Sequence, residues 1–404
     1  MKFFHLSDLH IGKQLHHYSL KEDQEAVLDE VVAYADSIRP DAVVIAGDIY
    51  DRPVPSAEAV AVFDRFLTGL SKIIPSIPVL IISGNHDSAD RLEYASDILK
   101  RHRIYLAGNV PRDASERLRK VTLSDNWGQV DFYLMPFLKP SYVRNVFEGE
   151  PPKTYTEAVE KLLMREGIDY KNRRNVLVSH QFYTGNISST RSAGNPVRGD
   201  KPELYPMTCD SETFCVGGIE NVEIRTVQDF DYAALGHLHG AQNVGSPRIR
   251  YCGTLLKYSV SECSHEKTLT VVMLGEKGEE PLIELLPLHP LRDVKKKTGN
   301  LRDIIDHAGE DERGDYISVT LTDETDPYKP KEQLEKVFDH ILEVRVDNLR
   351  TRKKLMELDE EMIMKDPLQN FADFYQEIQG KPLTDEEAEM MGRIFEQAKE
   401  GWEE

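Results

Sequence analysis

Four short apolar runs, separated by segments with helical periodicity, constrain the fold of this chain more than any other feature. Each run has the length and composition of a buried strand, and the segments between them repeat apolar residues at helical spacing. This alternation predicts an α/β fold in which helices pack on sheets. The strand-like runs are Phe3–Leu6, Val43–Ala46, Val79–Ile82 and Val176–Val178, and the helical segments are 21–38, 56–72 and 153–166.

Short strand-like runs dominate the sequence from about residue 220 onward. They predict a second sheet that packs on the first. The segment Pro287-Leu-His-Pro290 then interrupts the pattern, and we place a domain boundary there, so that the α/β domain spans residues 1–287. The later strand-like runs are Val222–Arg225, Ile249–Cys252, Leu269–Leu274 and Leu282–Leu286.

Residues 288–348 have the pattern of a small α+β domain. Two strand-like runs, Ile317–Leu321 and Val344–Val346, flank a stripe of apolar residues at helical spacing. We therefore expect one helix between two strands in this domain. The stripe consists of Leu334, Val337, Phe338 and Ile341.

Residues 349–404 predict a tail with two amphipathic helices. Pro367 suits the first position of one helix, and Thr384 with Glu387 has the spacing of a capping box at the start of the other. The apolar stripes of such helices can form core or dock on a partner. We expect the tail to bind a partner protein.

The composition limits the class of protein. No apolar run approaches the ~18 residues that span a membrane, and the first ten residues turn polar too early for a signal peptide. The four cysteines form no Cys-x-x-Cys pair, which favours reduced thiols in a cytoplasmic protein. The formal net charge of −20 disfavours a nucleic-acid partner, but residues 355–404 alone carry 15 acidic and 4 basic side chains. The acidity is therefore largely a property of the tail.

Five short polar motifs each follow an apolar strand-like run. In open α/β sheets, ligands bind beyond the carboxyl ends of the strands. Five polar clusters at five strand ends are therefore expected to converge on one site. The motifs are Asp8-Leu-His10, Gly47-Asp48-Ile-Tyr-Asp51-Arg52, Gly84-Asn85-His86-Asp87, Ser179-His180 and Gly236-His237-Leu-His239.

The residue types in these motifs suit divalent metal ions. Aspartate and histidine are common ligands of manganese, iron and zinc, and asparagine can add a neutral oxygen. The glycines before Asp48, Asn85 and His237 are expected to let the backbone turn sharply at a crowded site. Two metal ions ~3.5–4 Å apart share a carboxylate between them, and Asp48 is the natural bridge.

The five motifs in this order resemble those of the calcineurin-like metallophosphoesterase superfamily. Segments 5–12, 47–53, 236–239 and 251–254 are similar, more closely, to the SbcD family of nuclease subunits in bacterial SbcCD complexes. This resemblance implies an α/β/β/α two-sheet sandwich with a small α+β cap and a C-terminal helical pair. The motifs of the superfamily cover residues 8–239. The resemblance spans most of the chain, although the cap and the tail match in pattern more than in motif.

The resemblance also implies roles for individual residues. One metal ion would be held by Asp8, His10 and His239, and the other by Asn85, His180 and His237, with Asp48 bridging the two. The family usually works with Mn²⁺. His86 would stabilise or protonate the leaving oxygen, and Asp51 would orient His86.

The function that the resemblance implies is a Mn²⁺-dependent DNA nuclease acting as double-strand exonuclease and as hairpin or single-strand endonuclease. It would work with the SbcC ATPase in DNA repair and recombination, as a homodimer within a heterotetramer, with the tail helices docking on SbcC. Four basic residues near the motifs are candidate contacts to DNA phosphates, although ordinary surface charge, or for His17 a solvated loop, is the simpler explanation. They are Lys13, His17, Arg52 and Arg91.

Two alternatives stay open on the sequence alone. The same metal motifs also serve cyclic-nucleotide phosphodiesterases, nucleotidases and phosphatases. A chain of this fold could also act as a non-catalytic scaffold that binds SbcC, although the complete ligand set argues against a scaffold.

Overall fold

The structure, a computed structural model, describes residues 1–185, 206–210, 212, 221–348 and 367–400. It divides into two compact units, one of residues 1–296 with 314–318 and one of residues 297–313 with 319–404. The domain limits that we predict at 287/288 and 348/349 stay a proposal. Residues 349–366 of the predicted tail lie outside the described residues.

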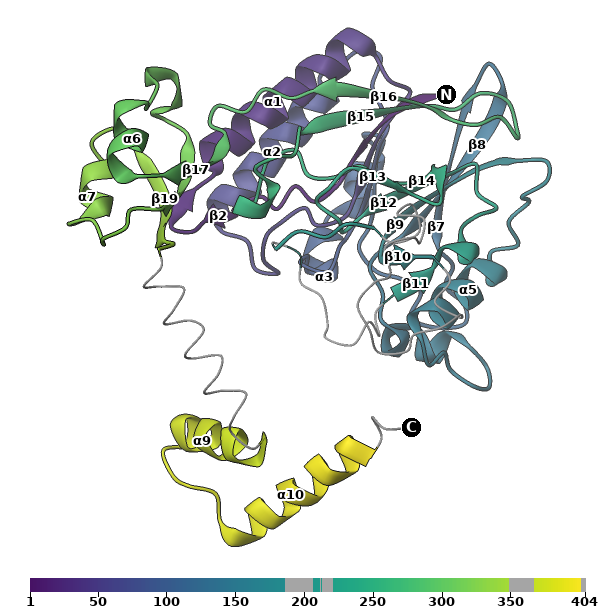
Figure 1. The fold of residues 1–404 in the computed structure, drawn as a ribbon. Helices are drawn as coiled ribbons and strands as arrows, with labels where there is room; N and C mark the ends of the chain where they lie inside the picture. The colour runs from purple at the N-terminus through teal and green to yellow at the C-terminus, as the bar shows by residue number, and fades with distance from the viewer. Residues whose placement is uncertain (186–205, 211, 213–220, 349–366, 401–404) are drawn as a thin grey trace. The chain divides into compact units, whose positions relative to one another are not determined.

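Two six-stranded sheets form the first unit, with strand orders β16-β15-β1-β4-β5-β6 and β13-β14-β12-β9-β8-β7 (Figure 1). The first sheet consists of β1 (Lys2–Leu6), β4 (Ala42–Ala46), β5 (Val79–Ile82), β6 (Ile104–Ala107), β15 (Thr268–Met273) and β16 (Leu282–Pro287). The second consists of β7 (Arg119–Asp125), β8 (Gly128–Met135), β9 (Arg174–His180), β12 (Tyr232–Gly236), β13 (Gln242–Val244) and β14 (Ser246–Tyr251).

The core between the two sheets explains why the apolar runs form strands. Phe3 and Val44 of the first sheet pack with Phe132 and Tyr232 of the second in one buried cluster. The rings of Phe3 and Phe132 meet edge to face with centroids 5.5 Å apart. The other face of the second sheet packs against helix α5 (Tyr155–Arg165). The predicted α/β sandwich is confirmed.

Helices α1 (Lys21–Ile38) and α2 (Ala57–Ser71) pack on each other alongside the first sheet (Figure 1). The start of α2 follows from its sequence, because the Ser56 hydroxyl accepts a hydrogen bond from the Ala59 amide. All three predicted helices of this unit are present within two residues of their expected limits. The remaining short strands and α-helices of this unit are β2 (Gln14–Leu15), β3 (Tyr18–Ser19), α3 (Ala89–Leu92), α4 (Ser96–Lys100), β10 (Phe182–Thr184) and β11 (Asn221–Glu223).

The predicted division of strands between the sheets is partly wrong. Strands β15 and β16 return to the first sheet, where β15 pairs antiparallel with β1 and His5 lies opposite Thr270. Strand β9, which we grouped with the first half, belongs to the second sheet and pairs with β12. The expectation failed because an apolar run marks a buried strand without specifying which distant strand it pairs with.

Later in the chain, β17 (Val294–Gly299), β18 (Tyr316–Leu321) and β19 (His340–Val346) form a three-stranded sheet, and helices α6 (Leu301–Asp306) and α7 (Pro330–Leu334) lie in the connections between these strands. The predicted helix over the stripe 334–341 is wrong beyond its first residue. Leu334 is the last residue of α7, Phe338 lies in the connection between α7 and β19, and Ile341 is the second residue of β19. All three side chains are nevertheless fully buried, so the stripe was a correct sign of burial.

The two predicted tail helices are α9 (Pro367–Gln379) and α10 (Asp385–Glu400). The capping box at Thr384 is formed, because Glu387 accepts the Thr384 amide at 2.8 Å. The rings of Phe371 and Phe395 meet at 6.3 Å between the helices, while Phe374 is 60% exposed. No helix among the described residues is long and apolar enough to cross a membrane.

Candidate metal centre

The predicted ligands lie at or just beyond the ends of five parallel strands. Asp8 follows β1, Asp48 follows β4 and Asn85 follows β5 in the first sheet. His180 ends β9 and His237 follows β12 in the second sheet. Because both sets of strands bring these residues to one place, His10 and His239 meet there although they are 229 positions apart in sequence.

The backbone at this site adopts positive φ angles, which residues other than glycine rarely take. Asp8, His10, Asp48 and His237 have φ angles of 52°, 42°, 50° and 106°. Hydrogen bonds from the Asp8 amide to the Gly47 carbonyl and from the His10 amide to the Asp48 carbonyl hold the first two loops together. Such strain is characteristic of functional sites, where the surrounding structure enforces it.

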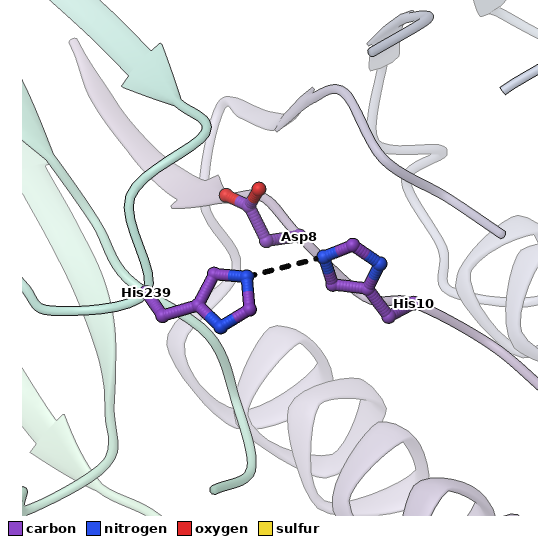
Figure 2. A group of neighbouring side chains, drawn as sticks. All are labelled: Asp8, His10 and His239. Carbon is purple, nitrogen blue, oxygen red and sulfur yellow. Dashed lines mark hydrogen bonds between the residues drawn. The ribbon is translucent and has the colours of Figure 1, made fainter. Parts of the chain in front are cut away.

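Asp8, His10 and His239 form the first group of side chains that could hold a metal ion (Figure 2). Their potential ligand atoms lie within 4.8 Å of one another, and all three residues are buried. The Nε2 atoms of His10 and His239 are 3.2 Å apart. Nδ1 of His239 lies 3.3 Å from the Glu262 carboxylate, which therefore leaves Nε2 as the ligand atom.

Asp8, Asp48 and His180 form a second such group. Nδ1 of His180 donates a hydrogen bond to the Ala46 carbonyl at 2.7 Å, so its Nε2 faces the site. That Nε2 lies 3.3 Å from Oδ2 of Asp48 and 3.0 Å from Oδ1 of Asn85. Oδ1 of Asn85 in turn lies 3.1 Å from Nδ1 of His237.

The donor set fits a divalent cation. Burial alone would lower the pKa of His180, but Asp48 and Asp8 outweigh it and raise the pKa to about 9. The two buried carboxylates therefore favour a positive charge at this place. A divalent metal ion would supply that charge, and Nε2 of His180 would bind it in the deprotonated form.

Asp48 occupies the position expected of a bridging carboxylate. Its Oδ2 lies 3.8 Å from Nε2 of His10, which belongs to the first group, and 3.3 Å from Nε2 of His180, which belongs to the second. Its Oδ1 accepts the His86 amide at 2.8 Å. One carboxylate thus faces both groups and also anchors the loop that carries His86.

The predicted contact between the Asp51 carboxylate and His86 does not occur in the structure. Nδ1 of His86 instead donates to the backbone carbonyl of Asp51, at 3.0 Å. The Asp51 carboxylate pairs with Lys13 at 2.8 Å and lies 3.7 Å from Nδ1 of His10. The expectation failed because sequence spacing brings the residue near His86 without specifying which of its groups makes the contact.

The glycines of the motifs have two different roles. Gly47 has a φ of 93°, in agreement with the predicted sharp turn. Gly84 and Gly236 do not have a positive φ but are needed for space. A Cβ on Gly84 would collide with the Asp48 carboxylate, and one on Gly236 would collide with the Ala46 carbonyl.

Two acidic residues support the centre although sequence reasoning gave them no role. The Asp87 carboxylate accepts the amides of Ile49, Tyr50 and Gly84 at 2.9–3.1 Å, which joins two of the ligand loops. Asp87 stands in the Gly-Asn-His-Asp motif, so its position was a usable signal. Glu262 has no such signal, because no motif surrounds it.

Glu262 is fully buried between His239 and Lys267. Its carboxylate lies 3.3 Å from Nδ1 of His239 and 2.6 Å from Nζ of Lys267. Burial alone would raise the pKa of Glu262, but His239 and Lys267 together hold that pKa well below its usual range. The carboxylate is therefore ionised and orients the His239 ring toward the site.

We expect Glu262→Gln to weaken metal binding by ~10–100-fold, the usual effect of removing the group that orients a metal-bound histidine. Titration of the metal-free protein with Mn²⁺, followed by calorimetry, measures the affinity. Thermal unfolding in EDTA provides the control for a loss of folding, since Lys267 loses its buried partner. An unchanged affinity in a folded variant would contradict the role of Glu262.

The four candidate DNA contacts differ in accessibility. Lys13 is paired with Asp51 and its side chain is only 16% exposed, so it is not available to a phosphate. His17 is exposed and its ring lies 4.0 Å from that of Tyr18. Arg52 and Arg91 are also exposed, Arg52 with 78% of its side chain.

Comparison with protein families places this architecture in a known class. Residues 1–241 match the family of calcineurin-like phosphoesterases, and residues 287–379 match the type 5 capsule protein repressor C-terminal domain. The two facing sheets and the buried histidine–carboxylate cluster at their strand ends are thus those of a calcineurin-like metallophosphoesterase. The match, together with the geometry of the cluster, supports a centre for divalent metal ions.

Proteins of similar sequence identify the family to which the chain belongs within this class. The chain is 29% identical over 409 residues to the SbcD component of the SbcCD nuclease of Staphylococcus saprophyticus, covering 98% of each protein. It is 30% identical over 346 residues to the same component of the Staphylococcus epidermidis nuclease, covering 85% of this chain and 84% of the relative. The chain belongs to the SbcD family of SbcCD nuclease components.

Among solved structures, the chain is similar to GAP50, the anchor in the inner membrane complex of Plasmodium. The TM-score is 0.36 and the identity 11%, with 72% of this chain and 89% of that chain covered. This similarity is too distant to support an argument.

Membership of the SbcD family supports a hydrolytic nuclease. It supports neither of the two alternatives, the small-substrate phosphoesterase and the non-catalytic scaffold.

Proposed function

We propose that the chain hydrolyses DNA phosphodiesters with two Mn²⁺ ions, at double-strand ends and at hairpins. It acts in the cytoplasm as the nuclease component of a complex with the SbcC ATPase, in DNA repair and recombination. The observation that supports the chemistry is the convergence of Asp8, His10, Asp48, His180 and His239 on one buried site. A homodimer within a heterotetramer is part of the same proposal.

In this proposal each ligand keeps the place that the sequence motifs suggest. Asp8, His10 and His239 hold one ion, Asn85, His180 and His237 hold the other, and Asp48 bridges them. Two such ions supply Lewis acidity for the phosphodiester and a water of lowered pKa. The chain's own contribution is to position the ligands through Glu262 and the Ala46 carbonyl.

His86 acts on the leaving oxygen. Its Nδ1 is held by the Asp51 carbonyl, which leaves Nε2 to face the substrate. Its ring also meets that of His10 edge to face at 4.8 Å, so it stands beside the first metal group. A protonated imidazole at this place donates a proton to the departing oxygen as the bond breaks.

The experiment that tests the function is digestion of linear duplex DNA, with closed circular DNA in parallel. Both are incubated with Mn²⁺ and with EDTA, each with and without SbcC and ATP. We expect loss of the linear DNA that requires Mn²⁺. Absence of DNA cleavage, with Mn²⁺-dependent hydrolysis of a small phosphodiester, would contradict the nuclease and favour the small-substrate phosphoesterase.

We further propose that the tail helices dock on SbcC, because α9 exposes Phe374 and Ile378 with 60% and 64% of their surface. Phe374→Glu is expected to lower co-purification with SbcC at least ~10-fold, since a charge replaces an aromatic anchor. Gln376→Glu, an exposed position on the same helix, is the matched control. Equal recovery of SbcC with both variants would contradict the assignment.

A further inference from the structure

A cleft of about 690 Å³ opens directly from the candidate metal centre at Asn85. Three connections border it: residues 83–89 beyond β5, residues 108–112 beyond β6, and residues 137–145 beyond β8. The cleft therefore lies at the same strand ends as the metal ligands. Its volume is within the ~300–1,000 Å³ typical of sites that enclose small ligands. A cleft of this size has room for a few unpaired nucleotides but not for a duplex.

The charges that line the cleft are positive on balance. Lys139 is exposed, and its side chain has no hydrogen-bond or ion-pair partner in the described part of the chain. Arg112 adds a second cation, although it is bonded to Asp90 at 2.5 Å. The one acid in the lining, Asp87, turns its carboxylate toward three backbone amides. In a chain with a net charge of −20, this cleft is suited to an anion.

An aromatic ring stands near this lysine. Tyr142 is 51% exposed and lines the cleft three residues after Lys139. Its backbone amide donates to the Lys139 carbonyl at 2.9 Å, so one short turn presents both side chains. An unpaired lysine beside an exposed aromatic ring is the combination that binds a phosphate and stacks a base in single-stranded nucleic acids.

A second cavity borders the centre near Asp51, but its lining fits a nucleic acid less well. It has a volume of about 400 Å³ and is lined by Lys21 and Arg52 together with the acids Asp51 and Glu58. Its positive charges are therefore balanced by negative ones. The cleft at Asn85 is both larger and more positive.

We propose that the cleft at Asn85 binds the unpaired nucleotides next to the phosphodiester that is cut, with Lys139 on a phosphate and Tyr142 stacked on a base. This inference rests on the proposed nuclease function and adds a site for the substrate strand. It follows that a strand must be unpaired near the cut to enter. Among the candidate metal ligands, Asp8 and His180 have no exposed surface, whereas Asn85, which lines the cleft, is partly exposed.

The test compares two substrates with the full-length protein in Mn²⁺. One is a DNA duplex with a single-stranded overhang, and the other is bis(p-nitrophenyl) phosphate, which carries no base and no second phosphate. Lys139→Ala and Tyr142→Ala are each expected to raise KM for the DNA ~10-fold, the scale of one lost phosphate or stacking contact. The kinetics on the small diester should not change. Tyr142→Phe should restore the wild-type KM.

The control variant is Lys171→Ala, an exposed lysine in the turn before β9, at the opposite end of that strand from His180. It should leave both substrates unaffected. In addition, Lys139→Ala should reduce the slope of log KM against log salt by about one, whereas Tyr142→Ala should not.

Three outcomes would overturn the inference, and they are distinguishable. An unchanged KM for DNA in both variants, with an active wild type, would reject the cleft and leave the nuclease function standing. Equal losses on DNA and on the small diester would show that the variants disturb the metal centre instead. Failure of the wild type to cut DNA would reject both the cleft and the proposed function.

Discussion

The Asp48→Asn variant is expected to lose bound metal and ~10²–10³-fold in activity, the range for removing one main electrostatic contribution to catalysis. Asparagine keeps the size of the side chain and an oxygen that can accept the His86 amide. It removes the negative charge that lies between Nε2 of His10 and Nε2 of His180. The charge, rather than the shape, is therefore what the variant tests.

Elemental analysis after incubation with Mn²⁺ and dialysis measures the metal content. We expect about two ions per chain in the wild type and at most one in the variant. Asp51→Asn is the matched control, because its carboxylate lies close to His10 but faces Lys13 and not His180. Two ions and full activity in Asp48→Asn would contradict the bridging role.

The His86→Ala variant is expected to lower kcat by ~10²–10⁴-fold, the range for a general acid, while keeping both metal ions. The structure places Nδ1 of His86 on a backbone carbonyl and leaves Nε2 for the substrate. Asp51→Asn leaves that carbonyl in place, so it should cost far less activity than His86→Ala. Single-turnover rates on DNA at saturating Mn²⁺ measure both effects.

One observation makes the result for His86 informative in either direction. His86, His10 and Asp48 also have potential ligand atoms within 4.8 Å of one another. Loss of metal from His86→Ala by elemental analysis would therefore show that His86 is a ligand and would reject its role as the acid.

Much of the site could be predicted from the sequence, because its signals are local. A polar motif directly after an apolar run places a candidate ligand at the end of a strand, wherever that strand pairs. Asp8, Asp48, Asn85, His180 and His237 were located in this way. The caps at Ser56 and Thr384 were also predictable, since a cap depends on atoms three residues away.

The rest depended on contacts between distant parts of the chain, which leave no local pattern. Strand β15 belongs to the first sheet because it pairs with β1, which lies more than 200 residues earlier in the sequence. Glu262 meets His239 across 23 residues without any motif around it. Local periodicity specifies burial and strand ends, whereas pairing and side-chain direction follow from the packing of the whole unit. For the same physical reason, the sequence named Asp51 as a neighbour of His86, and only the tertiary structure showed that its carbonyl makes the contact.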